Sequence, residues 1–198
     1  MNNNIQSAPN LVFESERLRF KPLGEEDLSL SIKLWTDPEV TQYVSGPTSE
    51  AELVKNHSKY MQRCAGGAIG VWTLTTLERR EKIGTAILLP MPVELDDTDW
   101  DLVAGDGLPD GDIEVGYILK KSAWGKGYAT EACARMIEFG FENTSLREIV
   151  ASIDEDNHAS EKVLLKSGLK PMGKQLSYGE QCPFFRITRE KWLERKIG

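Results

Sequence analysis

A glycine-rich stretch at residues 122–131 reads SAWGKGYATE. It follows an apolar run from Ile113 to Leu119 and precedes apolar residues spaced as on one face of a helix. Glycines let the backbone approach a ligand closely, and the first N–H groups of a helix lack intrahelical partners and carry the positive end of its dipole. The stretch is therefore suited to binding a phosphate or pyrophosphate.

Two common phosphate loops do not fit these residues. A dinucleotide loop needs a third small residue where Thr130 stands, and an acid about 20 residues after the loop, where Arg147 stands. A nucleoside triphosphate loop needs Ser or Thr directly after Gly-Lys, but Gly127 follows Gly125-Lys126. The sequence therefore excludes both kinds of phosphate loop.

The stretch resembles the acetyl-coenzyme A loop of the GNAT superfamily of N-acetyltransferases. That pattern is Gln/Arg-x-x-Gly-x-Gly/Ala, with Gly127 and Ala129 at its last two fixed positions and Trp124 replacing Gln or Arg. The string WGKGYATEA is similar to the form in the branch that acetylates ribosomal-protein N-termini (RimJ/RimL-like). Further motifs extend the resemblance over nearly the whole chain: ERLRFKPL at 16–23, DPEV at 37–40, NHAS at 157–160 and KSGL at 166–169.

The resemblance implies an α/β (α+β) fold with one GNAT-like domain over residues 11–198. Its mixed, mostly antiparallel sheet should be flanked by helices and splayed between its fourth and fifth strands, with the cofactor in the gap. A chain of 198 residues with 40% hydrophobic content is long enough for one sizeable core. Residues 1–10 are polar and are expected to form a flexible end.

Local patterns predict the elements that position the loop. Strands are expected at 18–22, 68–76, 82–89, 113–119, 147–153, 173–177 and 184–188. Helices are expected at 28–34, after Ser49 with Glu52 as a capping box, at 129–141, at 158–167 before Gly168, and as a last turn near Trp192. A strand therefore leads into the glycine loop, and a helix leaves it.

The resemblance also implies which residues hold acetyl-coenzyme A. The backbone of Tyr117, Ile118 and Leu119 should pair with the pantetheine amides, and Trp124 and Asn157 should support the site. The pyrophosphate should be held by N–H groups of the loop, from Gly125, Lys126, Gly127, Tyr128, Ala129 and Thr130. The cations Lys120, Lys121 and Lys126 are either phosphate neighbours or ordinary surface lysines.

An acceptor amine needs a base. An α-amine has a pKa near 8 and a lysine one near 10.4, so either arrives mostly protonated at neutral pH. Glu114, on the strand before the loop, is the candidate base, with a solvent-facing strand glutamate as the alternative and Asp154 as a reserve. The reaction is expected to be a direct transfer, with no covalent intermediate on Cys133.

The departing thiolate needs a proton. Many relatives use a tyrosine in the helix after strand five, but Leu164 stands at the matching position here. Ser160 is the candidate replacement, or it only caps its helix. A coenzyme A thiol, with a pKa like that of cysteine at about 8.5, is also a tolerable leaving group unaided.

The acceptor is expected to be a protein N-terminal α-amine. The alternatives are a small-molecule amine, polyamine or antibiotic, and a coenzyme A-binding sensor without turnover. Tyr43 and Ser45 lie in a loop that in the family borders the acceptor cleft, although ordinary loop packing explains them equally well.

Charge narrows the partners further. The net charge of −7 disfavours nucleic acid and membrane surfaces and suits a cationic substrate. Eight acids without Lys or Arg lie at about 90–112, so the rest of the chain sums to +1. This acidic insertion is expected to be a solvated loop rather than a substrate-gathering flap.

The cysteines and histidines give no metal-ligand spacing, so no metal is expected. Three scattered cysteines and two histidines are present. We also expect neither a signal peptide nor a membrane span. The cysteines are therefore expected to be reduced thiols in a cytoplasmic protein, and the protein is expected to be a monomer or homodimer.

Overall fold

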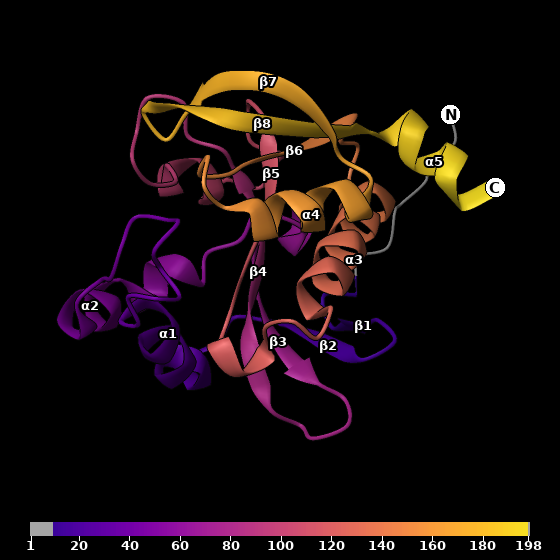
Figure 1. Ribbon diagram of the computed structural model, residues 1–198. Coiled ribbons are helices and arrows are strands. Elements are labelled where there is room, and N and C mark those ends of the chain that lie inside the picture. Colours follow the sequence, from indigo (N-terminus) through magenta and orange to yellow (C-terminus); the bar gives the residue numbers. More distant parts are fainter. Residues whose placement is uncertain (1–9, 198) are drawn as a thin grey trace.

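Eight strands form one sheet in the computed structural model, which describes residues 10–197 (Figure 1). Their spatial order is β1-β2-β3-β4-β5-β6-β8-β7. The strands are β1 Phe13–Glu14, β2 Leu18–Pro22, β3 Gly70–Thr76, β4 Lys82–Pro90, β5 Ile113–Leu119, β6 Glu148–Ser152, β7 Lys170–Ser177 and β8 Glu180–Thr188. The α-helices are α1 Leu28–Trp35, α2 Glu50–Tyr60, α3 Tyr128–Asn143, α4 His158–Ser167 and α5 Arg189–Ile197.

The sheet is splayed in its middle. All neighbouring strands are antiparallel except β5 and β6, which run parallel and pair at a single position, Glu114 with Val150. Beyond this pair, towards Leu119, the two strands are not registered. The expected mixed sheet with a splay between β5 and β6, the fourth and fifth predicted strands, is confirmed.

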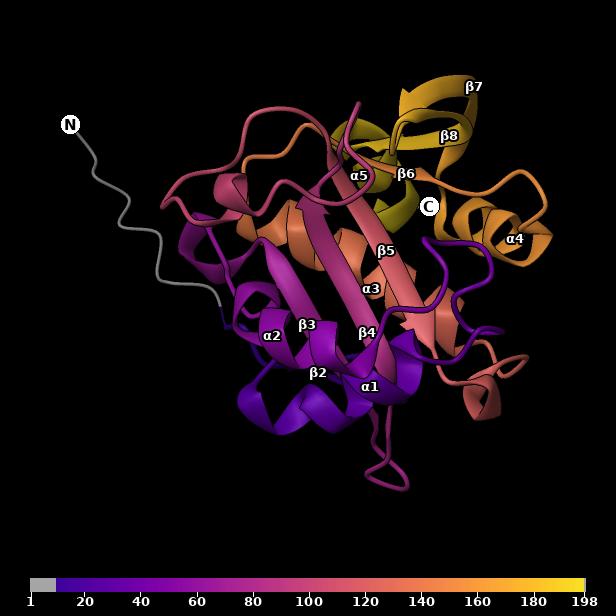
Figure 2. The ribbon, with the colours of Figure 1, turned by 90° about the vertical axis from the view of Figure 1, so that its left-hand side faces the viewer.

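Helices cover the two faces of the first half of the sheet. Helices α1 and α2 lie on one face and α3 on the other (Figure 2). Side chains alternate between these faces along a strand. Leu88 of β4 points to α3, because a Cβ on Gly140 would approach it to 3.0 Å. Its successor Leu89, registered with Glu114, therefore places Glu114 on the face turned away from α3.

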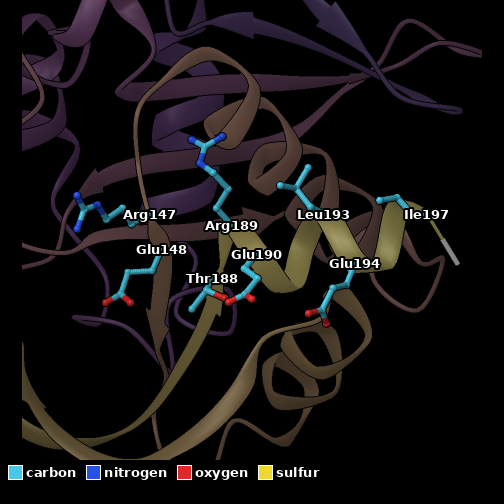
Figure 3. Close-up of a pocket in the computed structure, with 8 residues that line it drawn as sticks. All are labelled: Arg147, Glu148, Thr188, Arg189, Glu190, Leu193, Glu194 and Ile197. Carbon is cyan, nitrogen blue, oxygen red and sulfur yellow. The ribbon is translucent and has the colours of Figure 1, made fainter.

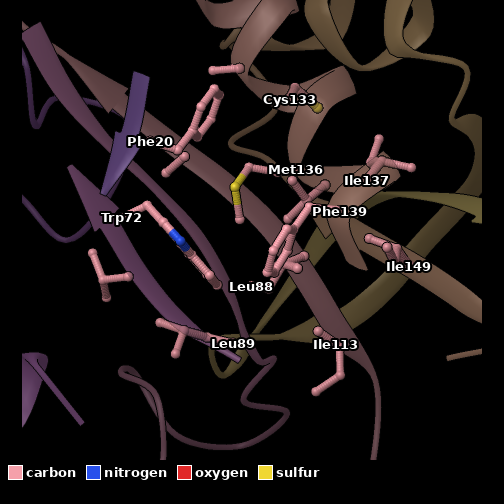
Figure 4. Close-up of a cluster of buried hydrophobic side chains, with 14 of the residues drawn as sticks. Phe20, Trp72, Leu88, Leu89, Ile113, Cys133, Met136, Ile137, Phe139 and Ile149 are labelled. Carbon is pink, nitrogen blue, oxygen red and sulfur yellow. The ribbon is translucent and has the colours of Figure 1, made fainter. Parts of the chain in front are cut away.

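Aromatic rings tie α3 to the first strands. Phe13 stacks between Phe20 and Phe139, with ring centroids 4.7 and 4.3 Å away, and Trp72 meets Phe139 edge-on at 5.2 Å. The side chains of Phe20, Trp72 and Phe139 are almost wholly buried (Figure 4). This core fixes α3, and with it the glycine loop, against the sheet.

Most predicted elements occur close to their expected bounds. Ser49 caps α2 by accepting from Glu52 N–H, and Gly168 ends α4 with φ of 99°. The tail is more regular than predicted: β7 and β8 start earlier, and α5 is a nine-residue helix rather than a turn. The expected flexible end, residues 1–10, lies almost entirely outside the described residues.

No helix in the described part of the chain has the length and apolar character needed to cross a membrane.

Candidate active site

Backbone groups of β5 face the splay. Lys120 N–H donates to Ile83 O at 2.8 Å. Gly84 and Leu119, the pair next to this bond, are therefore a non-hydrogen-bonded antiparallel pair, and their own backbone groups point away from each other. Leu119 therefore directs its backbone groups towards β6. Tyr117, two residues earlier on the same strand, does the same. The backbone groups of Ile118 face Thr85 in β4, so any part of Ile118 in holding a cofactor falls to its half-buried side chain.

One of the groups facing the splay is already occupied. The indole N–H of Trp124 donates to Leu119 O at 2.8 Å. Trp124 thus anchors the loop to the end of β5, although the residue as a whole is 43% exposed. Both backbone groups of Tyr117 and the N–H of Leu119 face the splay as well, in an orientation that suits pairing with an extended ligand.

The glycine loop presents free donors at the start of α3. Gly125 and Gly127 take φ of 70° and 80°, a region that favours glycine. The first helical bond from this end is Glu131 N–H to Gly127 O. Within residues 10–197, the N–H groups from Gly125 to Thr130 have no protein acceptor. This cradle fits the pyrophosphate of a coenzyme A molecule.

A cluster that the sequence analysis missed holds this loop in place. The Glu131 carboxylate accepts from Ser15 Oγ, Arg17 N–H and Arg17 Nε, each at 2.7 Å. The Arg17 guanidinium also donates to Lys126 O at 2.9 Å and lies 4.7 Å from the centre of the Tyr128 ring. Both Arg17 and Glu131 lie in the quoted motifs, but only the fold shows that they meet.

Replacing Arg17 by alanine should loosen the loop without touching the reacting groups. We expect the KM for acetyl-coenzyme A to rise about three- to tenfold, with kcat little changed, because charge-assisted bonds to a half-exposed arginine contribute modestly. Steady-state kinetics against acetyl-coenzyme A measures this. Arg19→Ala is the control, since Arg19 is similarly exposed but pairs with Glu14 instead. Equal KM values in the two variants would contradict the role of Arg17.

Two of the three lysines considered as phosphate neighbours are engaged elsewhere. Lys120 Nζ donates to Lys82 O at 2.5 Å, and Lys121 Nζ pairs with Glu39 at 2.5 Å. Lys126 is exposed in the loop itself. It is the member of the trio best placed to meet a phosphate.

Helix α4 faces Tyr117 across the splay. Asn157 caps this helix by accepting from Ser160 N–H at 3.1 Å, so its side chain has a structural task. The Tyr117 hydroxyl donates to Ser160 O at 3.5 Å. Leu164, at the position where relatives carry a tyrosine, is buried. The structure thus brings Tyr117 and Ser160 together.

Glu114 is buried beside the same splay. The residue is 4% exposed, and its carboxylate accepts a hydrogen bond from the Tyr178 hydroxyl. Burial raises the pKa of its carboxyl to about 7, the bond from Tyr178 opposes this rise, and the charge of Asp97 adds to it. The solvent-facing alternative for Glu114 is therefore excluded, and a carboxyl with this pKa can exchange protons at neutral pH.

The acidic insertion is anchored as well as solvated. Most of its acids are exposed, as expected, but Trp100 and Val103 are buried in the core. The Trp100 ring lies 5.4 Å from that of Tyr60 in α2, and Lys59 Nζ lies 3.9 Å from Asp97. The insertion therefore packs over α2, on the face of the sheet that carries Glu114.

A hollow of about 680 Å³ lies elsewhere, beside α5 (Figure 3). Its walls come from the start of β6, the end of β8 and α5: Arg147, Glu148, Thr188, Arg189, Glu190, Leu193, Glu194 and Ile197. None of these belongs to the glycine loop or neighbours Glu114 in the sheet. A smaller hollow, about 250 Å³, includes Lys126 and Tyr128 of the loop. The larger of these two hollows is therefore not the one that includes residues of the glycine loop.

The Cys133 thiol is buried in the core. Burial raises the pKa of the Cys133 thiol to about 12, which makes it a poor nucleophile at neutral pH. No group of three His, Cys, Asp or Glu side chains among residues 10–197 could hold a metal ion.

A strand end, an N–H cradle that opens a helix and a splayed neighbouring strand form an arrangement suited to binding an acyl-coenzyme A, as in the N-acetyltransferase class. The sequence profile of the acetyltransferase (GNAT) domain matches residues 17–170, and the chain belongs to this family. It is an acetyl-coenzyme A-dependent N-acetyltransferase. The family assignment and the site rest on different observations and agree.

Individual relatives are distant. The FsC-acetyl coenzyme A-N(2)-transacetylase of Aspergillus fumigatus is 28% identical over 96% of this chain and 80% of its own. Among solved structures, a GNAT-family acetyltransferase from Bacillus anthracis has a TM-score of 0.69 at 20% identity, covering 90% of this chain and 99% of its own. A spermidine N-acetyltransferase from Vibrio cholerae, solved with CoA and spermine, has a TM-score of 0.68 at 16% identity, covering 90% and 99%. The structural matches support the fold.

Proposed function

We propose that this enzyme acetylates a primary α-amine, with Glu114 as the general base. The observation that carries the proposal is a buried carboxyl on β5, three residues before the backbone of Tyr117 that faces the splay. A base there can meet an amine arriving from the face opposite α3. The loop and β5 would hold acetyl-coenzyme A, which supplies an activated acetyl group as its thioester.

The residues then divide the proton transfers. Glu114 takes a proton from the ammonium, and the amine nitrogen forms a bond to the thioester carbonyl carbon. The carbon–sulfur bond breaks as the nitrogen gives up its second proton to a water molecule and the amide forms. Ser160 gives a proton to the departing thiolate and regains one from that water. Backbone N–H groups at Tyr117 and Leu119 are the candidates to stabilise the oxyanion.

Matching proton affinities support an α-amine as the acceptor. Moving a proton from an amine of pKa near 8 to a carboxyl of pKa about 7 is uphill by about 1.4 kcal/mol. For an amine of pKa near 10.4 the same step is uphill by about 4.6 kcal/mol. Glu114 therefore suits an α-amine better than a lysine or a polyamine.

Two kinds of α-amine acceptor remain. The resemblance of WGKGYATEA to the RimJ/RimL-like branch supports a protein N-terminus. A small-molecule amine is the second candidate, supported by the name of the Aspergillus relative, an N(2)-transacetylase. Exposed acids of the insertion, Asp97 among them, favour a cationic molecule in either case. The free thiols of Cys64, Cys133 and Cys182 support a reducing compartment such as the cytoplasm.

A thiol-release assay at pH 7 tests the proposal. We expect turnover with amino-acid amides and peptides that have free N-termini, and little with the same peptides after N-terminal blocking, even when they contain lysine. Spermidine and aminoglycosides complete the panel. Turnover confined to these last two would overturn the α-amine assignment. A Ser160→Ala variant with unchanged kcat on the best acceptor would remove Ser160 from the mechanism.

A further inference from the structure

Tyr178 occupies an unusual backbone position. It follows Ser177 in the turn between β7 and β8, where Ser177 and Glu180 form the last pair of the hairpin. Tyr178 and Gly179 have φ of 56° and 73°. Two positive φ values define a type I′ turn, whose first position favours Asn, Asp or Gly. A bulky tyrosine there is strained, and such strain concentrates at functional sites.

The surroundings hold this tyrosine firmly. Its N–H donates to Pro92 O at 3.0 Å, and Gly179 N–H donates to Val93 O at 2.9 Å. The tip of the hairpin therefore rests on the start of the insertion, beside which it lies in Figure 1. The Tyr178 ring packs against a separate small core of Met91, Val150 and Phe184.

Its hydroxyl reaches Glu114 from a distant part of the chain. Within the described residues, this is the only hydrogen bond to the Glu114 side chain. The neighbours of Glu114 in β4 and β6, Leu89 and Val150, are apolar. The titratable groups that face the pair are Asp97, whose charge acts on both members, and Cys182 in β8, which acts on Tyr178.

We infer that Tyr178 is a positioning residue for acetyl transfer, which holds the Glu114 carboxylate in place and governs its affinity for a proton. This inference rests on the proposed role of Glu114 as base. A donor at this place favours the ionised carboxylate, the form a base needs, where burial alone favours the protonated acid. This role explains why a strained turn is kept at Tyr178, because the turn brings the tyrosine hydroxyl to the Glu114 carboxylate.

The Tyr178→Phe variant isolates the hydroxyl, since it keeps the ring packing and the turn. Without the donor, the carboxyl should bind its proton more tightly, and the acidic limb of kcat/KM should move up by about one pH unit. At pH 6 this is about a tenfold loss, while the variant and the wild type should converge above pH 9, with the KM for acetyl-coenzyme A unchanged. Tyr60→Phe is the control: it removes another tyrosine hydroxyl close to Asp97, and its pH profile should not move.

A titration without turnover separates this inference from the role of Glu114. Infrared titration of ¹³C-labelled glutamate, with Glu114→Gln to identify the band, should show a higher carboxyl pKa in Tyr178→Phe. An unchanged carboxyl pKa overturns the inference, even where Glu114→Gln proves that Glu114 is the base. A raised pKa with an unmoved pH profile overturns both assignments.

A second variant protects the test against misfolding. Should Tyr178→Phe fail to fold, 3-fluorotyrosine at position 178 is a nearly isosteric and stronger donor. It should move the acidic limb to lower pH. A limb that stays in place, or moves up, contradicts the inference.

Discussion

Replacing Glu114 by glutamine is expected to lower kcat/KM about 10²- to 10⁴-fold at neutral pH, the usual loss when a general base is removed. Glutamine keeps the shape of the side chain and can still accept the bond from Tyr178. Affinity for acetyl-coenzyme A should persist, because backbone groups of β5 and the glycine loop are the expected holders. Isothermal titration with coenzyme A and initial-rate kinetics measure the two effects separately.

The pH profile should carry a second signature of Glu114. With a carboxyl pKa of about 7, the wild type loses kcat/KM as the pH falls below about 7, because protonated Glu114 cannot accept a proton. The glutamine variant should lack this limb. Its deficit should shrink as the pH approaches the pKa of the acceptor, near 8 for an α-amine and near 10.4 for a lysine. The pH of rescue thus also reports the acceptor class.

Asp154→Asn is the matched control for this experiment. Asp154 is exposed, and its carboxylate accepts from Asp156 N–H at 2.8 Å in the turn before α4. Its replacement should leave the rate nearly unchanged. Wild-type kcat/KM in Glu114→Gln, together with a large loss in Asp154→Asn, would transfer the role of base to Asp154.

Gly84→Ala should damage both the fold and the site. Gly84 lies in β4 opposite Leu119, and a Cβ there would lie 2.2 Å from Ile118 O, a backbone atom that cannot rotate aside. Strands β4 and β5 would have to separate. We expect a loss of about 3 kcal/mol in the free energy of unfolding, the upper end for an overpacked site, measured by urea unfolding.

The same variant should bind coenzyme A more weakly, because β5 carries the backbone groups that face the splay. Gly105→Ala is the control, since a Cβ at Gly105 meets nothing within 4 Å. It should leave both stability and affinity near the wild-type values. Equal unfolding midpoints for the two alanine variants would show that the strands adapt more easily than this geometry implies.

The sequence predicted what depends on local pattern. The strand, glycine loop and helix from Ile113 to Asn143 follow from apolar spacing and glycine chemistry within about 30 residues, and all three are present. The alternation of side chains along one strand was enough to predict that Glu114 and Tyr117 point to opposite faces of the sheet. The resemblance to the family suggested Ser160 as a proton donor, and the structure adds the contact of its backbone carbonyl with the Tyr117 hydroxyl.

What the sequence did not predict depends on distant contacts. Tyr178 and Glu114 are 64 residues apart, and Arg17 and Glu131 are 114 apart, so no local pattern links them. The acidic insertion was predicted to be a solvated loop because of its many acidic residues. Its burial depends on Trp100 and Val103, two apolar residues whose partners in α2 and the core are apparent only in the fold.

The single pair joining β5 to β6 also affects self-association. An unpaired row of backbone groups at the outer edge of a sheet invites strands of other chains and promotes aggregation. Here the row at Tyr117 and Leu119 lies in the interior of an eight-stranded sheet, with β6, β8 and β7 beyond it. A strand of another chain would have to displace these three strands to pair along its length, whereas a slender, linear ligand would not. The fold thus places backbone groups that can pair with a ligand inside the sheet, away from its outer edges.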